Sequence, residues 1–480
     1  MKLVVQKDSA TPIHQQIYHQ VLNRIQTGSL PDGEKMPSLR KLSNELDVNY
    51  LTVNKVYQRL EEERHIEILQ GKGAFVRSRH KTKPFIDGEK EQEVFSTLLQ
   101  RSQYLVNRSK SHYDFSKAVV SPGLLPSHFL AQQTKAIIDQ NPMILTTYGP
   151  VEGDEELREE VAIYVEQQLG YRTEANDILI TSGVQQGINI VANTFLSPTD
   201  TVAVESPCYG AAIDTFMNKG NAILPIEMDD EGMRMDVLET HCRTAPPKLV
   251  YVNPTFQNPT ARTMSERRRK ELLELAETYN FLIIEDDSFS EVYFDGVLPP
   301  KPIKYFDSTG HCIFLKGFSK TMAPGIRLGA IIADESLYES LYISKASMDV
   351  GSPLLNQKAL LPFMKTKRMK DHLEKLRIAL QIRRDMTIEI LDVYLNGQIR
   401  YEQPKGGLNL WVELPDTIDV EALQRLAKEH SISFLPGSAC YVTDSPTSSI
   451  RLSYSTLSDR ENTEGITQLA SLIASQLSRS

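Results

Sequence analysis

Four groups of residues in this 480-residue sequence could act together in one chemical site. Lys320 lies in the segment Phe318–Gly329 (FSKTMAPGIRLG), where a lysine amine could serve as a nucleophile, and Arg327 follows seven residues later. Two cations near one another suit a phosphate group. Ser182-Gly183-Val184 follows an expected strand and begins an expected helix, and the N–H groups of a helix N-terminus bind phosphate. Asp286 lies between two further acids at the end of another expected strand.

Pyridoxal 5'-phosphate (PLP) is a cofactor that needs this combination. It requires a lysine amine, backbone N–H groups for its phosphate, a carboxylate for its pyridine nitrogen and an aromatic ring on which to stack. Tyr209, which follows a further expected strand, offers the ring. Each signal is weak alone, because most lysines are solvated and many tyrosines only fill cores. Their conjunction predicts PLP as the cofactor.

The elements that must position these residues alternate along the chain. Short apolar runs at 178–180, 202–204, 249–252, 282–284 and 326–332 predict strands, and stretches such as 265–279 predict helices between them. This alternation is typical of an α/β fold with a mainly parallel sheet covered by helices on both faces. A long helical stretch at about 353–395 precedes a final α+β segment. That segment has expected strands at 408–412 and 450–454 and an expected helix at 460–477.

The first 80 residues have a different organisation. Ile13, Ile17, Val21 and Ile25 recur every four residues and predict a first helix. Ser38 caps an expected second helix, a third helix follows, and two short strands joined by a glycine turn complete the unit. Three helices and a hairpin indicate a winged helix-turn-helix, whose third helix enters the major groove of DNA. A helical bundle that binds another protein is the alternative.

Candidate DNA contacts lie at the starts of the second and third helices and at the tip of the hairpin, where polar and basic side chains can reach phosphates or base edges. They are Ser38, Arg40, Asn49, Tyr50, Thr52, Asn54 and Lys72.

Charge supports the same division. Residues 1–80 contain 12 Lys and Arg against 9 Asp and Glu, whereas the whole chain has a net charge of −9. A mildly basic head on an acidic body suits a small DNA-binding domain attached to a larger one. The N-terminus has no apolar signal core, and no apolar run is long enough to span a membrane, so we expect a cytoplasmic protein that does not bind membranes. The four cysteines are scattered without metal-ligand spacing and predict reduced thiols and no metal site.

We therefore expect three parts. Residues 10–78 form the DNA-binding domain, residues 79–113 form a linker with a possible helix at 89–106, and residues 114–480 form the PLP-binding domain. Its small C-terminal subdomain begins at about residue 396.

The head resembles the GntR family of bacterial regulators. The similar segments are Pro12-Ile13, Pro37-Ser38-Leu39-Arg40, Thr52-Val53 and Gly71-Lys72-Gly73-Ala74-Phe75-Val76. The resemblance covers the whole head and implies binding to a double-stranded DNA operator. Many relatives have a basic residue where Tyr50 stands, so base readout is expected to differ here.

The body resembles the fold-type I, class I aminotransferases over roughly residues 114–480. The similar segments occur in the family's order and include Gln257-Asn258-Pro259-Thr260, Glu285-Asp286-Asp287 and Phe318–Gly329. The resemblance implies that Lys320 forms the Schiff base with PLP and that Arg327 and Ser319 contribute to the same cofactor site. It further implies that Asn258 binds the ring hydroxyl.

The same resemblance implies four more roles. Asp286 pairs with the protonated pyridine nitrogen, and Tyr209 stacks on the ring. Tyr148 reaches the phosphate across the interface of a homodimer, and Arg451 grips the α-carboxylate of an amino-acid-like ligand, a role that suits its planar, two-pronged guanidinium.

Four residues depart from the aminotransferase pattern. Ser288 and Phe289 stand where active relatives often have a tyrosine that bonds the ring hydroxyl. Gly317 stands where a serine or threonine often touches the phosphate, and Ala261 replaces a glycine. The changes at 288, 289 and 317 predict weak or absent transamination and count less against PLP binding.

The fusion resembles the MocR group of the GntR family. It implies a PLP-dependent transcription regulator in which an amino-acid-like effector reacts at Lys320, forms an aldimine with the cofactor and changes DNA binding. Three alternatives stay open: a working aminotransferase with an autoregulatory head, a regulator that senses PLP itself, and a body that serves only as a dimerisation scaffold. The sequence does not identify the effector, the operator or the sign of regulation.

Overall fold

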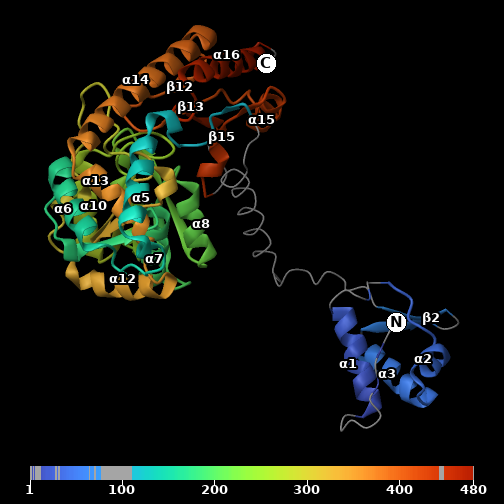
Figure 1. Cartoon of the computed structure of the whole chain (residues 1–480). Coiled ribbons are helices and arrows are strands. Elements are labelled where there is room, and N and C mark those ends of the chain that lie inside the picture. Colours follow the sequence, from blue (N-terminus) through green and yellow to red (C-terminus); the bar gives the residue numbers. More distant parts are fainter. Residues whose placement is uncertain are drawn as a thin grey trace. The chain divides into compact units, whose positions relative to one another are not determined.

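The computed structural model describes residues 3, 5, 12–26, 30, 33–63, 65–69, 72–76, 111–442 and 448–478. They form two compact units, an N-terminal head whose described residues end at Val76 and a C-terminal body whose described residues begin at Ser111 (Figure 1). Nearly all of the predicted linker, with its possible helix at 89–106, lies outside the described residues. None of the helices that the structure describes is both long and apolar enough to cross a membrane.

The head is a winged helix-turn-helix, as predicted. Its elements are α1 (Ile13–Gln26), α2 (Leu39–Leu46), α3 (Tyr50–Glu62), β1 (Ile66–Leu69) and β2 (Gly73–Val76). The two strands form an antiparallel hairpin. Ile17, Val21 and Leu60 are fully buried, so the apolar faces of the helices share one core.

Side-chain caps fix where the second and third helices begin. The Ser38 hydroxyl accepts a hydrogen bond from the Lys41 amide at 3.3 Å, as the sequence predicts. Asn49 does the same for α3, because its Oδ1 accepts from the Leu51 amide at 2.8 Å. The Tyr57 phenol donates to the Pro37 carbonyl at 2.7 Å and thereby holds α3 against the start of α2.

The body is built on an eight-stranded mixed sheet in the order β4-β11-β10-β9-β8-β5-β6-β7. The five strands from β10 to β6 run parallel, and β11 and β7 are antiparallel to their neighbours. The strands are β4 (Ile178–Thr181), β5 (Thr201–Ser206), β6 (Ala222–Asp229), β7 (Gly232–Met233), β8 (Leu249–Val252), β9 (Leu282–Asp287), β10 (Cys312–Gly317) and β11 (Gly329–Ile332).

Helices cover both faces of this sheet (Figure 1). Successive strand residues point to opposite faces, so Leu179 packs with the core under α7 while Ile178 and Ile180 pack with the core under α6. The helices are α5 (Ser127–Gln140), α6 (Glu155–Leu169), α7 (Val184–Phe195), α8 (Gly210–Asn218), α9 (Met235–Cys242), α10 (Glu266–Tyr279), α11 (Ile303–Phe306), α12 (Glu335–Met348) and α13 (Leu354–Met364). The predicted α/β class is confirmed.

Some boundaries differ from the expectations. The strand expected at 326–332 begins at Gly329, because Pro324–Ile326 forms a 3-10 turn and Arg327 has a left-handed φ of 53°. The long helical stretch at 353–395 is two helices, α13 and α14 (Lys367–Leu395).

The small lobe carries a second sheet in the order β12-β13-β16-β15, with α14 and α16 side by side (Figure 1). Its elements are β12 (Arg400–Tyr401), β13 (Asn409–Glu413), α15 (Val420–Glu429), β14 (Ile432–Ser433), β15 (Leu435–Pro436), β16 (Ser449–Ser453) and α16 (Asp459–Leu477). The body's first strand, β3 (Tyr113–Asp114), pairs with β14. Residues that directly follow the linker region in the chain are therefore part of this lobe.

Candidate functional site

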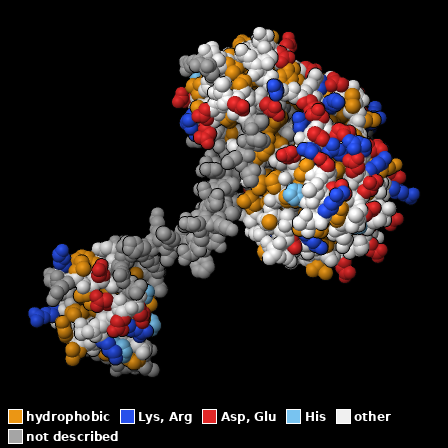
Figure 2. Space-filling view, turned by 180° about the vertical axis from the view of Figure 1, so that it is seen from behind, with side chains coloured by type: hydrophobic (Ala, Val, Ile, Leu, Met, Phe, Trp, Pro, Cys, Tyr) orange, Lys and Arg blue, Asp and Glu red, His pale blue; other side chains and the backbone are white. Residues whose placement is uncertain are grey.

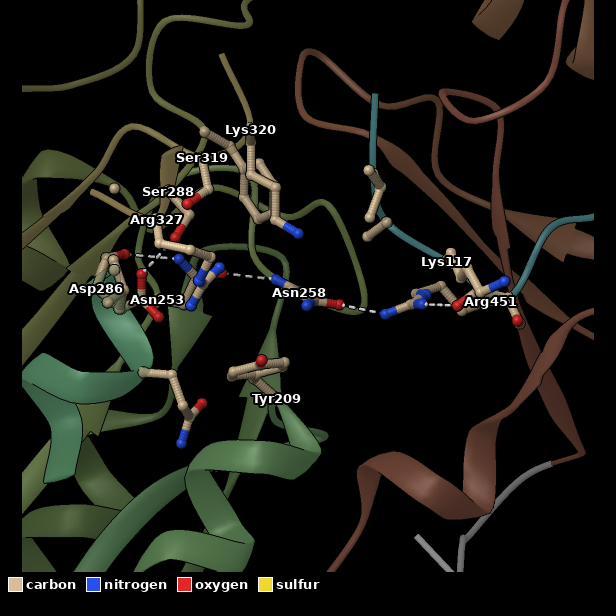
Figure 3. A pocket seen from close by; sticks show the side chains of 18 residues that line it. Lys117, Tyr209, Asn253, Asn258, Asp286, Ser288, Ser319, Lys320, Arg327 and Arg451 are labelled. Atoms are coloured by element: carbon tan, nitrogen blue, oxygen red, sulfur yellow. Dashed lines mark hydrogen bonds between the residues drawn. The ribbon is translucent and has the colours of Figure 1, made fainter. Parts of the chain in front are cut away.

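A cavity of about 270 Å³ in the body brings most of the predicted cofactor residues together (Figure 3). Its walls come from the carboxyl ends of the parallel strands and from the small lobe, which is the usual ligand position in an open α/β sheet. The predicted residues that line it are Gly183, Val184, Tyr209, Asn258, Asp286, Ser319, Lys320, Arg327 and Arg451.

Close backbone packing shapes the predicted phosphate end. Gly183 has a φ of 103° and precedes the first residue of α7. Gly183, Val184 and Gln185 line the cavity, so the first turn of that helix, where N–H groups lack helical partners, lies at its wall. Arg327 donates from Nη2 to the Ser182 carbonyl at 2.9 Å. A Cβ atom on Gly329 would lie 2.9 Å from the Gly183 Cα, so only glycine permits this approach. Helix amides and an arginine form a cradle of the kind that binds phosphate.

Asp286 ends β9 as a buried carboxylate. The Tyr251 phenol donates to its Oδ2 at 2.7 Å, and the Ser288 hydroxyl donates to its Oδ1 at 2.9 Å. Burial raises the pKa of Asp286 to about 6, and these two hydrogen bonds act in the opposite direction. The carboxylate is therefore still mainly ionised at neutral pH and can pair with a protonated ring nitrogen.

Lys320 follows β10 and extends into the same cavity (Figure 3). Burial, together with the positive charges of Arg451 and Arg327, lowers the pKa of its amine to about 8, and the negative charge of Asp286 acts in the opposite direction. A lysine with a lowered pKa has more neutral amine at physiological pH, and the neutral amine is the form that attacks an aldehyde.

Arg451 projects from β16 of the small lobe toward Asn258 (Figure 3). Its Nη1 donates to the Asn258 Oδ1 at 2.8 Å, and its Nη2 donates to the Ser116 carbonyl. Its Nε is buried and has no hydrogen-bond partner among the described residues. A buried guanidinium with an unused donor suits a carboxylate ligand.

Two aromatic side chains, those of Tyr209 and Phe289, line the cavity. Tyr209 lies at the start of α8, and in Figure 3 its ring lies on the opposite side of the pocket from Lys320. Burial raises the pKa of its phenol to about 12, so the phenol stays neutral. Phe289 is buried and lines the cavity without a hydroxyl group, as its sequence position predicts.

Tyr148 is the predicted cofactor residue that stays apart. Its side chain is 81% exposed and does not line the cavity. Ser182 contributes through its carbonyl, which accepts the Arg327 hydrogen bond.

Sequence reasoning missed several residues of the site. Asn253 lines the cavity, donates from Nδ2 to the Asp286 carbonyl at 2.6 Å and accepts from the Asn258 amide at 2.7 Å. Ser116, Lys117, Ala118 and Val119 form part of the wall. Only the Asn253 position, just after the apolar strand β8, carried a usable signal, because polar residues at the carboxyl ends of parallel strands gather at one edge.

On the face of the head that Figure 2 shows, basic, acidic and apolar side chains are intermixed. Arg40, Asn49, Tyr50 and Lys72 are exposed, whereas Thr52 and Asn54 are half-buried. Ser38 is also exposed, and its hydroxyl acts in the cap of α2. Leu51 is not one of the predicted contacts, yet it is 68% exposed at the start of α3. Among the residues that the structure describes, no group of His, Cys, Asp and Glu could hold a metal ion.

Comparison with known proteins identifies both units. The profile of the family "Aminotransferase class I and II" matches residues 124–469, and that of "Bacterial regulatory proteins, gntR family" matches residues 13–76. The uncharacterized HTH-type transcriptional regulator YdfD of Bacillus subtilis is 30% identical over 98% of both chains. Aromatic-amino-acid aminotransferase 1 of Thermococcus litoralis is 31% identical over 75% of this chain and 87% of its own length.

Solved structures agree for the body. The kynurenine aminotransferase of Pyrococcus horikoshii has a TM-score of 0.74 and 31% identity, and the match covers 81% of this chain and 97% of that protein. LysN, an α-aminoadipate aminotransferase of Thermus thermophilus, has a TM-score of 0.74 and 28% identity over 81% of this chain and 99% of its own. That structure contains N-(5'-phosphopyridoxyl)-L-leucine.

The cradle at Gly183, the buried Asp286 carboxylate and the Lys320 amine fit PLP, and the comparisons imply the same cofactor. The chain belongs to the class I and II aminotransferase family and, with its GntR-type DNA-binding head, is a MocR-type transcriptional regulator.

Proposed function

We propose that this protein changes its binding to DNA when an amino-acid-like effector enters the cavity between Lys320 and Arg451. The main support for this proposal is Arg451, because its guanidinium is buried in the cavity and its Nε has no hydrogen-bond partner among the described residues. An effector carboxylate could accept from Nε and Nη2 together, and such two-pronged pairs are among the stronger hydrogen-bonded interactions. The effector amine would then be directed toward Lys320.

The chain's own residues have separable tasks toward the cofactor. PLP supplies a reactive aldehyde and an electron-withdrawing ring when it is bound. Arg327 and the α7 amides would hold the phosphate, Asp286 would keep a proton on the ring nitrogen, and Asn258 would bind the ring hydroxyl. Lys320 would hold the cofactor in the resting state and accept a proton when an effector amine replaces its own.

Transmission to DNA requires that the effector favour one arrangement of the protein over another. Arg451 lies on the small lobe, while Lys320 and Asp286 lie on the large sheet. An effector that contacts both would favour a closed arrangement of the two lobes, and this preference is the differential binding that regulation needs.

A homodimer is the second part of the proposal. Met143, Leu145 and Tyr148 are exposed on one segment, and Val350 is exposed on another. The two segments adjoin, because a Cβ atom on Gly351 would lie 2.6 Å from the Gly149 carbonyl oxygen. Exposed apolar side chains that cluster in this way are typical of protein interfaces. Tyr148 would then be covered by a second copy of the chain.

An active aminotransferase is the runner-up. Asp286, Lys320 and Arg451 meet in one cavity, which is the set that transamination uses. Phe289 counts against efficient turnover, because it offers the ring hydroxyl no hydrogen bond. A sensor of PLP itself is a third possibility, in which loading of Lys320 alone would change DNA binding.

One experiment separates these functions. The full chain is loaded with PLP, and its visible absorbance spectrum and DNA affinity are measured with a panel of L-amino acids. A spectral shift that changes DNA affinity without keto-acid release supports the proposal, and steady keto-acid production supports the aminotransferase. A change of DNA affinity on PLP loading alone supports the PLP sensor. Loss of the visible band in Lys320→Ala identifies the Schiff-base lysine, and no band in the unmodified protein would leave only a scaffold.

A further inference from the structure

The Asp286 carboxylate is held from two directions by hydroxyl groups. Tyr251 lies on the neighbouring strand β8 and donates to Oδ2 at 2.7 Å, and Ser288 lies just beyond β9 and donates to Oδ1 at 2.9 Å. A carboxylate oxygen has two lone pairs, so each oxygen can still accept another hydrogen bond. Two donors therefore fix the plane of the carboxylate and leave acceptor capacity for a ligand.

The Tyr251 phenol stays protonated and therefore remains a hydrogen-bond donor to Asp286. Its ring is fully buried and packs edge-to-face on Phe216, with ring centroids 6.1 Å apart. Burial, followed by the negative charge of Asp286, raises the pKa of this phenol well above its usual range. Tyr251 does not line the cavity, so it can act on a ligand only through Asp286.

Gly317 makes room for the second donor. A Cβ atom at Gly317 would lie 3.2 Å from the Ser288 hydroxyl oxygen and 3.0 Å from Cγ2 of Val184. Contacts this short require a neighbour to move. The glycine at 317 and the serine at 288 are therefore structurally linked, since the missing side chain at one position accommodates the hydroxyl at the other.

The acidic side chains next to Asp286 in the sequence form ion pairs of their own. Asp287 and Glu291 both pair with the buried Lys316, at 2.9 Å and 2.6 Å. Lys320 and Arg327 face Asp286 across the cavity. Among the described residues, the side chains that donate hydrogen bonds to the Asp286 carboxylate are therefore those of Tyr251 and Ser288.

We propose that Tyr251 and Ser288 are positioning residues that hold the Asp286 carboxylate ionised and oriented toward the ring nitrogen of PLP, and that Gly317 is the glycine this arrangement requires. The proposal rests on PLP binding and does not depend on which effector the protein senses. It explains how a site that lacks the phenol at position 289 still controls the protonation of the ring.

The test measures proton uptake when PLP binds. The full chain is freed of cofactor and titrated with PLP by calorimetry at pH 7, in buffers of different ionisation enthalpy. Unmodified protein is compared with Tyr251→Phe, Ser288→Ala and Gly317→Ala. Tyr454→Phe is the matched control, because Tyr454 is another buried tyrosine and its phenol donates to the Gly407 carbonyl in the small lobe, away from Asp286.

Loss of either donor should raise the pKa of Asp286 in the cofactor-free protein, so that more of the carboxyl groups already carry the proton that the ring nitrogen would otherwise take up from solution. A rise of about one unit from about 6 would lower the uptake by about 0.4 proton for each PLP bound at pH 7. We expect this decrease, with weaker PLP binding, in all three site variants and not in Tyr454→Phe. Gly317→Ala should match Ser288→Ala.

Unchanged uptake and affinity in both Tyr251→Phe and Ser288→Ala would overturn the proposal. An equal decrease in Tyr454→Phe would also overturn it, because the effect would then be a general loss of structure. Asp286→Asn provides a further check, since normal PLP binding in that variant would show that the carboxylate is not the partner of the ring. Failure of effector sensing would leave these results untouched, so the two ideas fail separately.

Discussion

Replacing Gly329 by alanine tests whether close backbone packing forms the phosphate cradle. The new Cβ would lie 2.9 Å from the Gly183 Cα, and 3.0 Å from both the Gly183 carbonyl carbon and the Lys316 carbonyl oxygen. All three atoms belong to the backbone, so no flexible side chain can give way. Overpacking of this kind costs about 1–3 kcal/mol. Relief requires β11 to move away from the turn that precedes α7.

We expect this cost to appear mainly as weaker cofactor binding. If the cradle opens to relieve the contact, an energy of about 1–3 kcal/mol corresponds to about 5- to 150-fold lower affinity for PLP. The assay is a PLP titration of the cofactor-free protein, with thermal unfolding measured in parallel. Gly325→Ala is the control in the same segment, because a Cβ atom there would meet nothing within 4 Å. If Gly329→Ala matched Gly325→Ala in both measurements, the packing argument would be wrong.

Three further predictions concern the cofactor amine, the effector grip and the head. The rate at which cofactor-free protein captures PLP should rise with pH with a midpoint near 8, because the lowered pKa of Lys320 sets the fraction of neutral amine. Stopped-flow absorbance measures this rate, and a midpoint at the ordinary lysine pKa would contradict the burial argument. Arg451→Lys keeps the charge but loses the planar donor pair, so amino-acid binding should weaken by about 10- to 100-fold with PLP binding intact; equal spectral titrations for both proteins would exclude this role. Lys72→Ala should weaken binding to duplex DNA and reduce the salt dependence by about one counterion, whereas Lys135→Ala on the body should change neither, and an unaltered slope in Lys72→Ala would remove the wing from the DNA interface.

The sequence was informative where function depends on short segments at strand ends. Lys320 and Asn258 follow apolar strands and Asp286 lies at the end of one, and the parallel sheet brings these strand ends to one edge. Local chemistry also predicted the Ser38 cap correctly. The strand that begins at Gly329 was placed too early, because apolar residues before it form a turn that only the left-handed Arg327 reveals.

The residues that were missed depend on long-range pairing. Tyr251 reaches Asp286 because β8 and β9 are neighbours, which no local pattern in either strand specifies. Ser116 meets Arg451 across 335 positions of sequence. Asn49 was expected to contact DNA, and its Oδ1 also caps α3, a second use that only the backbone geometry showed. The assignments of single residues to cofactor, effector and DNA stay predictions until the variants are measured.

The short strand β3 anchors the segment of chain that leads directly into the cavity wall. Tyr113 and Phe115 are bonded through their amides to Ser431 and Ser433, and residues 116–119 then line the cavity. The first described residues of the body therefore lead into the part of the cavity wall that lies beside Arg451. If the proposed effector displaced this wall, it would also displace the first described residues of the body, which follow the head in the chain. Changing the number of residues between head and body would then be expected to change the effect of the effector on DNA binding.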